Sequence, residues 1–401
     1  MTRPERPINL YDLLHDSAAR CPHKEAVVFQ HNRKTYHALK KNSIPIRRRS
    51  SREAGRIYTS GTKGKPKGAM LSHGNILHSV LNYEKHLSTN NKTVTLLAVP
   101  MFHVTGLIGQ MFHMVRVGGK SVILPRYQTT PFIQTIEKEG ITFLFNVPAI
   151  YQMLVSTCEK NSFSSFKGIQ VVAYGGAPMN TPLLQELRKW FPNANLHNTY
   201  GATETSSPTA IMPQVYLESK IEAVGKPVQG VEVKIITEDN KECAYGEIGE
   251  LWVKGPMVIP RYWNNEKANK TSFEEGYWKT GDYACLDQDG FLYIKDRKKD
   301  MINRGGEKIY SIEVESVLLK HPDIKEAAVK GAPHKLFGEC VEAFVVPENR
   351  SVEKEKVLQF VAQHLADYKV PEHIHLIDEL ARNPGGKVMK HLLTNEKSTK
   401  Q

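Results

Sequence analysis

Apolar runs of strand length alternate with helix-like segments through about the first three hundred residues of this chain. Three of these runs have the length and composition of buried strands: Ser121–Pro125, Ile141–Asn146 and Ile169–Gly176. Successive strands joined by helices form a sheet whose faces the helices cover. The alternation therefore predicts a layered α/β architecture for the larger part of the chain.

A period-two pattern follows in residues 231–255. The segments Val231–Asn240 and Gly246–Gly255 alternate side-chain character at every second position, with turn residues between and within them. This pattern predicts a small antiparallel, barrel-like sheet.

The predicted elements become shorter after the charged segment Lys295–Asp300. The segment Val341–Pro347 predicts a strand, and residues 355–368 predict a helix whose apolar face comprises Val357, Phe360, Val361 and Leu365. We therefore expect a large N-terminal domain over residues 1–298 and a smaller α+β C-terminal domain over residues 299–401. The charged, glycine-bearing junction at residues 295–306 is the expected hinge.

Composition indicates a globular, enzyme-sized protein. Of the 401 residues, 40% are hydrophobic and 24% are charged, and the mean hydropathy is −0.41. No apolar run approaches the roughly 20 residues of a membrane helix, and the first residues lack the apolar core of a secretory signal. The five cysteines are dispersed without metal-ligand spacing. We expect a cytoplasmic protein with reduced thiols.

The formal net charge of +12 is compatible with nucleic acid, an anionic membrane surface or a polyanionic small molecule as partner. The densest basic cluster, Ile44–Glu53, has no interleaved aromatic residues. Short basic runs of this kind are more often solvated linkers than nucleic-acid sites. We therefore expect no nucleic-acid partner.

The stretch Tyr58–Gly74 combines four glycines, three lysines and several hydroxyl side chains. A loop of this kind leaves backbone N–H groups free to converge on an anion, and its glycines remove Cβ obstruction. It has neither the G-x-x-x-x-G-K-[ST] order of a P-loop nor the G-x-G-x-x-G of a dinucleotide fold. The stretch predicts a phosphate-binding loop of another kind.

Four further motifs follow this loop: YGATET (Tyr200–Thr205), WKTGDY (Trp278–Tyr283), the segment Tyr293–Glu315, and RNPGGKVMK (Arg382–Lys390). In this order, the five stretches resemble the adenylate-forming superfamily of acyl-CoA synthetases, luciferases and peptide-synthetase adenylation domains. The resemblance runs from residue 57 to about residue 390. It implies that the chain uses ATP and Mg²⁺ to activate a small carboxylic acid as an acyl-adenylate and then transfers the acyl group to coenzyme A.

The resemblance also implies roles for two groups of nucleotide-binding residues. The β- and γ-phosphates would be held by Thr59, Ser60, Gly61, Thr62 and Gly64, with Lys67 as a further cation. Lys63 stands at the usual second threonine of the loop, and a lysine pairs with phosphate as a point charge without the short hydroxyl hydrogen bond. The adenine pocket would be lined by Gly175, Gly176, Ala177, Tyr200 and Gly201.

Three residues match the family's catalytic positions. Thr203 would contact the α-phosphate, and Glu204 would hold Mg²⁺, since a carboxylate suits a hard cation. Lys387 of the small domain would offset the repulsion between the attacking carboxylate and the α-phosphate. The ribose hydroxyls would donate hydrogen bonds to Asp282, and Arg297 would reach the same ribose.

In this family the small domain rotates before the second half-reaction. Lys299 matches the hinge position, and Gly305 and Gly306 match a loop that then lines the pantetheine tunnel. Rotation would withdraw Lys387 and admit the thiol to the acyl-adenylate.

The segment Pro100–Met114 matches the family's acyl pocket, with His103, Gly106 and Leu107 as the expected lining residues. Relatives that activate α-amino acids carry an aspartate where this chain has His103, so an amino-acid substrate is not expected. The apolar side chains of the segment favour a medium- or long-chain fatty acid, and hence a place in lipid metabolism, with an aryl acid as the second choice.

The family normally carries a long segment between the parts that match Val27–Asn42 and Ile57. Here about a dozen residues, 43–56, bridge that gap. We expect strands that would be interior to become edge strands. Two alternatives to the synthetase reading follow: a truncated, inactive relative that binds nucleotide or a protein partner, and an adenylation enzyme that loads a carrier protein. Peripheral membrane contact and oligomeric state are left open.

Overall fold

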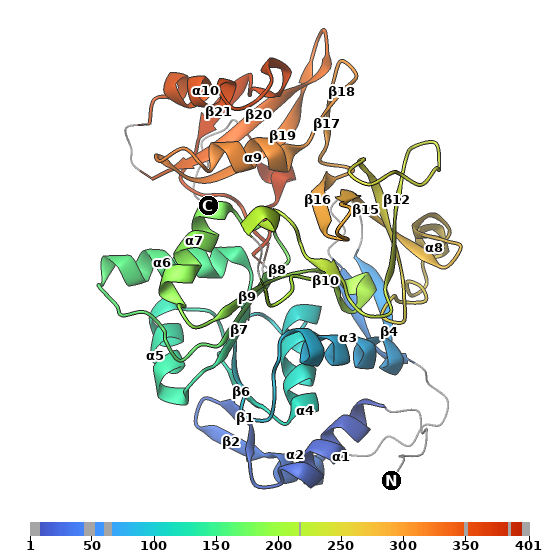
Figure 1. Ribbon diagram of the computed structural model, residues 1–401, viewed down its shortest axis with the longest axis vertical. Helices are drawn as coiled ribbons and strands as arrows, with labels where there is room; N and C mark the ends of the chain where they lie inside the picture. Colours follow the sequence, from blue (N-terminus) through green and yellow to red (C-terminus); the bar gives the residue numbers. More distant parts are fainter. Residues whose placement is uncertain are drawn as a thin grey trace.

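The computed structural model describes residues 9–43, 53–59, 66–215, 218–348, 352–383 and 386–394. These residues form a larger lobe from the N-terminal and central parts of the chain and a smaller lobe from the C-terminal part, drawn in orange and red in Figure 1. The α/β class predicted from the sequence is confirmed. In the described ranges, no helix has the length and apolar character needed to cross a membrane.

The larger lobe is built on a nine-stranded sheet. Its strands are β1 (Glu25–Phe29), β2 (Asn32–Thr35), β5 (Val94–Leu97), β6 (Lys120–Ile123), β7 (Phe143–Asn146), β8 (Val171–Gly175), β9 (Asn195–Ala202), β10 (Ser207–Ile211) and β11 (Lys226–Pro227). They lie in the order β11-β10-β9-β8-β7-β5-β6-β1-β2, and the neighbours from β9 to β1 run parallel. The predicted strands at residues 121–125, 141–146 and 169–176 correspond to β6, β7 and β8. Every residue of β7 and β8 is buried.

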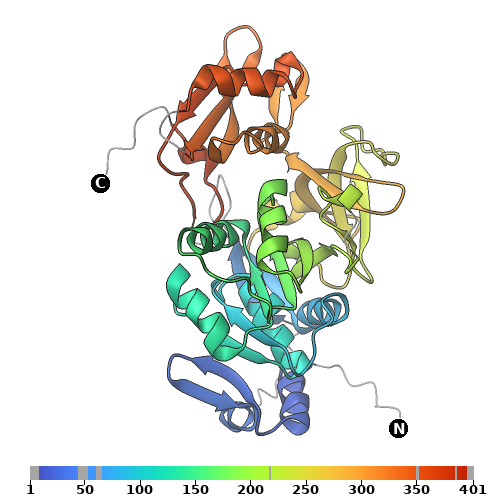
Figure 2. The same cartoon turned by 60° about the vertical axis from the view of Figure 1, so that its left-hand side comes forward.

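Helices cover both faces of this sheet (Figure 2). They are α1 (Leu10–Arg20), α2 (Tyr36–Asn42), α3 (His73–His86), α4 (His113–Val117), α5 (Thr129–Glu139), α6 (Pro148–Lys160), α7 (Thr181–Trp190) and the π-helix η1 (Thr105–Phe112). On one face, α5, α6 and α7 pack through a cluster that includes Phe132, Leu154 and Leu187. On the other face, α3 and α4 contribute Tyr83 and Met114. The carboxyl ends of β7, β8 and β9 lie along one edge between these layers, where ligands bind in open α/β sheets.

A five-stranded antiparallel sheet stands beside the larger sheet, at the right of Figure 1. It comprises β12 (Glu232–Ile236), β13 (Gly249–Lys254), β14 (Phe273–Glu274), β15 (Tyr277–Leu286) and β16 (Leu292–Arg297), with the helix α8 (Glu266–Ser272) before β14. The antiparallel unit predicted from residues 231–255 is present as β12 and β13. The strand pairings of the described residues leave this sheet open.

Two strands, β3 (Glu53–Thr59) and β4 (Lys67–Ser72), form a separate small sheet in the described part of the chain. Ile57 and Leu71 anchor it against α3. The outer edge of β4 is covered, because the Trp263 N–H donates to the Gly68 carbonyl at 2.7 Å. The described strands include no partner for the outer edge of β3, so β3 is an edge strand within the described ranges.

The smaller lobe packs two helices, α9 (Ser311–Leu318) and α10 (Lys354–Ala362), against a further five-stranded sheet. The strands are β17 (Ile302–Arg304), β18 (Glu307–Ile309), β19 (Ile324–His334), β20 (Gly338–Pro347) and β21 (His373–Leu376). Short 3₁₀ turns are η2 (Thr203–Thr205), η3 (Glu218–Lys220), η4 (Asp367–Lys369) and η5 (Lys390–Leu392). The predicted strand at residues 341–347 lies within β20. The predicted helix at 355–368 is shorter than expected, since α10 ends at Ala362 and leaves Leu365 beyond it.

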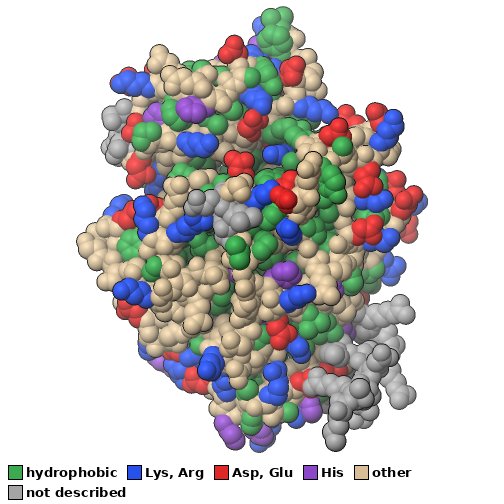
Figure 3. Space-filling model, in the orientation of Figure 1, with side chains coloured by type: hydrophobic (Ala, Val, Ile, Leu, Met, Phe, Trp, Pro, Cys, Tyr) green, Lys and Arg blue, Asp and Glu red, His purple; other side chains and the backbone are tan. Residues whose placement is uncertain are grey.

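Charged side chains of both signs are mixed over the molecular face in Figure 3. Lysines and arginines alternate there with aspartates and glutamates and form no single continuous basic patch on this face. The basic cluster predicted to be a linker, Ile44–Glu53, lies outside the described residues except for Glu53, the first residue of β3.

Candidate active site

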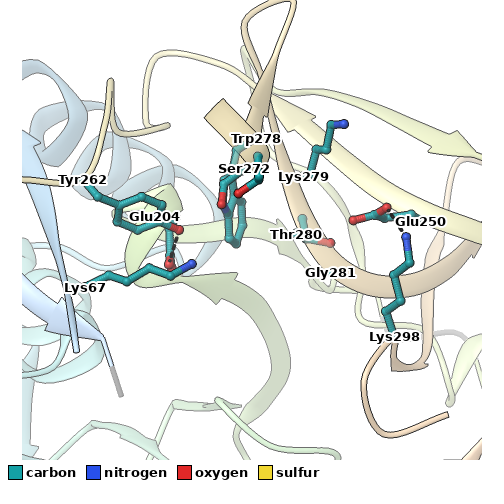
Figure 4. A pocket seen from close by; sticks show the side chains of 11 residues that line it. Lys67, Glu204, Glu250, Tyr262, Ser272, Trp278, Lys279, Thr280, Gly281 and Lys298 are labelled. Atoms are coloured by element: carbon teal, nitrogen blue, oxygen red, sulfur yellow. Dashed lines mark hydrogen bonds and ion pairs between the residues drawn. The ribbon is translucent and has the colours of Figure 1, made fainter. Parts of the chain in front are cut away.

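A polar cavity of about 430 Å³ lies where β4, η2 and the antiparallel sheet meet. Its lining comprises Lys67, Glu204, Glu250, Tyr262, Thr271, Ser272, Trp278, Lys279, Thr280, Gly281 and Lys298. Figure 4 shows Lys67 and Glu204 on one side and the ion pair between Glu250 and Lys298 on the other. Segments far apart in the sequence therefore build one charged cavity that suits a polyanionic ligand.

Glu204 points into this cavity from the η2 turn. The Tyr262 hydroxyl donates a hydrogen bond to Glu204 Oε1 at 2.8 Å. Burial raises the pKa of Glu204, and the hydrogen bond from Tyr262 and the charge of Lys67 oppose that rise. Glu204 is suited to bind Mg²⁺. A Mg²⁺ ion that arrives with the nucleotide would offset the cost of keeping this buried carboxylate ionised. Thr203 precedes it in the same turn.

Asp282 lies at the centre of a second polar group. The Tyr200 hydroxyl donates to Asp282 Oδ2 at 2.6 Å, and Arg297 Nε lies 3.5 Å from Asp282 Oδ1. The register of β15 and β16 sets Asp282 directly opposite Arg297. Burial and the neighbouring Asp282 charge raise the pKa of Tyr200, so its hydroxyl stays protonated and donates. The three predicted nucleotide residues are thus brought together.

Lys387 reaches this group from the smaller lobe. The pKa of Lys387 is lowered to about 8, chiefly by burial and then by the nearby Arg297 cation, whereas the Asp282 charge opposes the shift. The Lys387 N–H donates to Asn383 Oδ1 at 2.9 Å, which fixes the turn that carries the side chain. The charges of Asp282 and Arg297 in the larger lobe thus act on Lys387, which comes from the smaller lobe.

The predicted adenine-pocket glycines lie at the carboxyl ends of β8 and β9. A Cβ on Gly175 would lie 2.3 Å from the Thr199 carbonyl oxygen, and a Cβ on Gly201 would lie 1.5 Å from the Ser207 carbonyl oxygen. Strand packing alone thus requires glycine at both positions. Gly176 has a φ of +79°, which favours glycine. The predicted neighbour Ala177 follows it and is partly buried.

A narrow slot of about 30 Å³ adjoins these strand ends. Its lining comprises Tyr83, Val104, Thr105, Phe145, Gly176, Thr199, Tyr200, Gly201 and Ser207. Tyr200 also contacts Asp282, so the slot and the nucleotide group share a wall. Tyr83 and Phe145 meet edge to face, with ring centroids 5.8 Å apart. The slot is the candidate acyl site.

The three residues expected to line the acyl pocket lie next to this slot without lining it. Leu107 packs into a core cluster with α3 and β4, and a Cβ on Gly106 would lie 2.7 Å from the Pro100 carbonyl oxygen. His103 is partly buried, and burial lowers its pKa. The neighbouring residues Val104 and Thr105 face the slot instead.

The phosphate loop is described at its two ends. Thr59 ends β3 and pairs with Lys67, the first residue of β4, and Lys67 lines the large cavity. The predicted phosphate-binding residues between them lie outside the described residues: Ser60, Gly61, Thr62 and Gly64.

The predicted hinge coincides with a change of sheet. The strand β16 ends at Arg297 in the antiparallel sheet, and β17 begins at Ile302 in the sheet of the smaller lobe. Lys299 lies between them and pairs with Asp300 at 3.3 Å. Gly305 and Gly306, with φ of +63° and +99°, form the β17–β18 turn away from both cavities.

Two sequence models match this chain. The AMP-binding enzyme model matches residues 47–263, and the AMP-binding enzyme C-terminal domain model matches residues 313–387. The chain belongs to the AMP-binding enzyme family. Among curated members, the 2-succinylbenzoate–CoA ligase of Bacillus licheniformis is 38% identical over 338 residues, 84% of this chain and 69% of that protein. The corresponding ligase of Bacillus subtilis is 37% identical and covers 84% of this chain and 68% of its own length.

Solved structures of the family agree with the fold. The o-succinylbenzoate coenzyme A synthetase of Bacillus subtilis bound to its acyl-adenylate has a TM-score of 0.84 at 26% identity, covering 97% of this chain and 99% of that one. The same enzyme with ATP and magnesium has a TM-score of 0.77 at 31% identity, covering 96% and 82%. ATP-bound MatB from Rhodopseudomonas palustris has a TM-score of 0.80 at 29% identity, covering 89% and 71%. The comparisons support, at the general level, an acid–CoA ligase that works through an acyl-adenylate.

For this family member, sequence reasoning missed several cavity residues. Tyr262, which orients Glu204, belongs to no motif quoted above, because only folding brings it to the η2 turn. Glu250 lies in a strand of alternating polar and apolar residues, and this pattern predicts an ordinary exposed charge there. Trp278 could have been predicted to line the cavity, because it is the first residue of the WKTGDY motif.

Proposed function

We propose that this chain is an ATP-dependent acid–CoA ligase whose acid is aromatic and of the 2-succinylbenzoate type. The observation that carries the general function is the convergence of Lys387, Asp282 and Arg297 from two lobes, beside a cavity that holds Glu204. The aromatic substrate is supported by relatives named for 2-succinylbenzoate and by the aromatic slot.

In the first half-reaction, a carboxylate oxygen of the acid attacks the α-phosphorus of ATP. A mixed-anhydride bond forms between the carboxylate oxygen and the α-phosphorus, and the bond from the α-phosphorus to pyrophosphate breaks. Both reactants are anions, so the positive charge of Lys387 lowers the barrier by stabilising the developing pentavalent centre. Carboxylic acids are already ionised at neutral pH, so this step needs no general base.

The remaining residues bind and orient the nucleotide. Asp282 would accept hydrogen bonds from the ribose hydroxyls while Tyr200 and Arg297 hold its carboxylate in place. Glu204 would hold Mg²⁺ together with phosphate oxygens, and the bound ion would neutralise phosphate charge. Lys67 adds a cation at the mouth of the phosphate loop.

In the second half-reaction, the CoA thiolate attacks the acyl-adenylate carbonyl, the thioester bond forms, and AMP leaves with the electron pair of the broken bond. Lys387 would occupy the approach to this carbonyl during adenylation, so the smaller lobe would have to turn away first. The change of sheet between Arg297 and Ile302 gives the chain a short connection about which the lobe can turn.

The shape of the slot favours an aryl ring over a long alkyl chain. Tyr83 and Phe145 provide flat aromatic walls, and Thr105, Thr199 and Ser207 provide hydroxyl groups. Its volume of about 30 Å³ is far below the several hundred cubic ångströms of a typical ligand pocket. The slot would have to widen for any of these acids, so the preference for an aryl acid rests on its aromatic walls, and it reverses the order of the two classes expected from the sequence.

The test is acid-dependent exchange of labelled pyrophosphate into ATP, followed by CoA thioester formation. The panel comprises 2-succinylbenzoate, benzoate, octanoate and palmitate. We expect exchange and thioester with 2-succinylbenzoate and little with palmitate. Folded protein that exchanges with none of the acids would overturn the proposal, and preference for palmitate would overturn its substrate assignment. Thioester formation on a carrier-protein pantetheine in place of CoA would indicate carrier loading.

A further inference from the structure

A second lysine of the smaller lobe, Lys390, lies in a cluster of ions at the junction of the lobes. Its Nζ lies 2.6 Å from Glu315 Oε1 and donates to Ser311 Oγ at 2.6 Å. The side chains of Lys390 and Glu315 are 20% and 14% exposed. Glu315 also accepts the Val329 N–H at 2.8 Å, so both partners of the pair are fixed.

Asp296 links this cluster to the larger lobe. It lies in β16 of the antiparallel sheet, is 1% exposed, and accepts the backbone N–H of Ser311 at the start of α9. Its charge acts on Lys390: burial lowers the pKa of Lys390, but Glu315 and Asp296 together outweigh burial and raise it. Lys390 therefore stays protonated. It pairs with Glu315 of its own lobe and contacts Ser311, whose N–H donates to Asp296 of the larger lobe.

Lys390 is three residues after Lys387 in the same C-terminal segment. The Met389 N–H donates to the Ala381 carbonyl at 2.8 Å, and the Asn383 N–H donates to the Lys387 carbonyl at 2.9 Å, so backbone hydrogen bonds connect residues 381–383 with residues 387–389. The ion pair of Lys390 with Glu315 and its hydrogen bond to Ser311, together called the Lys390 tie, therefore limit where the Lys387 ammonium can lie.

We propose that Lys390 is a positioning residue for the first half-reaction, which holds Lys387 beside Asp282 by tying the C-terminal segment to Glu315 and Asp296. The inference rests on the proposed function and assigns that site a further residue. When the smaller lobe turns, Asp296 and the smaller-lobe residues of the cluster separate, so Lys390 contributes to adenylation and not to thioester formation.

The decisive variants are K390M, which keeps a side chain of similar length and removes its charge, and K390R, which keeps the charge. We expect K390M to slow pyrophosphate exchange on the order of 10²-fold, the effect of misplacing a reacting group by about 1 Å. CoA thioester formation from separately synthesised aryl-adenylate should stay within about 3-fold of wild type, and K390R should restore most of the exchange. Equal loss in both half-reactions would show a structural role and overturn the inference.

The ion pair between Lys369 and Glu313, a second glutamate of α9, provides a matched control. Lys369 pairs with Glu313 of α9 at 2.7 Å, and its side chain is 19% exposed, close to the value for Lys390. Both pairs lie within the smaller lobe, but Asp296 of the larger lobe accepts from Ser311, the residue that Lys390 contacts, and not from the Lys369–Glu313 pair. K369M should leave both half-reactions unchanged. The double variant K390M/E315Q removes the unpaired carboxylate and should stay slow in exchange; recovery would mean that the stranded charge, not the lost tie, caused the defect.

A measurement without turnover separates this inference from the proposed function. Hydrogen–deuterium exchange over residues 386–394 should lose protection in K390M and keep it in K369M. Unchanged protection in K390M would overturn the inference even for an inactive protein. An inactive wild-type protein in which K390M loses protection would overturn the proposed function and leave the tie standing.

Discussion

Lys387 is the residue whose charge state matters most to the proposed chemistry. Its pKa of about 8, lowered from 10.5 chiefly by burial, lies close to the physiological range. The cation is present below this value and is lost as pH rises through it. The same shift has the opposite sign for stability: between about pH 8 and 10.5 the unfolded chain binds the extra proton, so this group's contribution to stability rises with pH.

We predict that kcat/KM for adenylation, which reports the free enzyme, falls above about pH 8 by roughly tenfold per pH unit. K387R stays charged throughout and should lack this decline even at a lower rate. The measurement is pyrophosphate exchange at subsaturating ATP between pH 6.5 and 9.5. An unchanged alkaline limb in K387R would assign the titration to another group.

Asp282 gives a second prediction at this scale. D282N removes the charge that Tyr200 and Arg297 contact and weakens the acceptor for the ribose hydroxyls. Hydrogen bonds to charged groups contribute about 1.5–3 kcal/mol, so the ATP Kd should rise on the order of 10- to 100-fold. Titration calorimetry with ATP measures this. The control D289N changes an exposed aspartate that pairs with Lys220 and should bind ATP as wild type does.

At the scale of elements, burial was the feature that the sequence predicted best. Within the runs at residues 141–146 and 169–176, the strands Phe143–Asn146 and Val171–Gly175 are fully buried, and most of their residues are apolar. The helix predicted at 355–368 ends early, since periodicity shows which face is apolar but not where tertiary packing stops. The π-helix η1 could not be predicted from the sequence, because π-helices are rare and apolar periodicity does not distinguish one from an α-helix.

Gly201 provides a prediction about the pairing of β9 and β10. An added Cβ would lie 1.5 Å from the Ser207 carbonyl oxygen, a backbone atom of the partner strand that cannot rotate away. G201A should therefore cost about 3 kcal/mol or more of the free energy of unfolding. Thermal and urea unfolding measure the loss. G168A, where a Cβ meets nothing within 4 Å, should unfold like wild type.

At the scale of the whole molecule, the motifs predicted which residues belong to the site but not how they meet. Asp282 and Arg297 are neighbours across the β15–β16 pairing, which the motifs alone do not predict. Lys387 reaches them from another lobe, and Tyr262 reaches Glu204 from a loop without a motif, so both contacts depend on tertiary packing. The slot is lined by Val104 and Thr105, which lie within one or two residues of His103, Gly106 and Leu107, the residues predicted for the acyl pocket.

The last prediction concerns the molecule as a binder of nucleotide. ATP with Mg²⁺ that binds the folded chain alone should stabilise it by about 2.7 kcal/mol at 100 times its Kd, seen as a rise in Tm. D282N should show a smaller rise at the same ATP concentration. The shift in Tm, taken together with the exchange assay, also distinguishes a working ligase from an inactive nucleotide-binding relative. The two differ in whether the small sheet, in which β3 is an edge strand next to the phosphate loop, still positions the phosphates. A rise in Tm with acid-dependent exchange supports the ligase, whereas a rise without exchange indicates a nucleotide-binding relative whose small sheet no longer positions the phosphates for reaction.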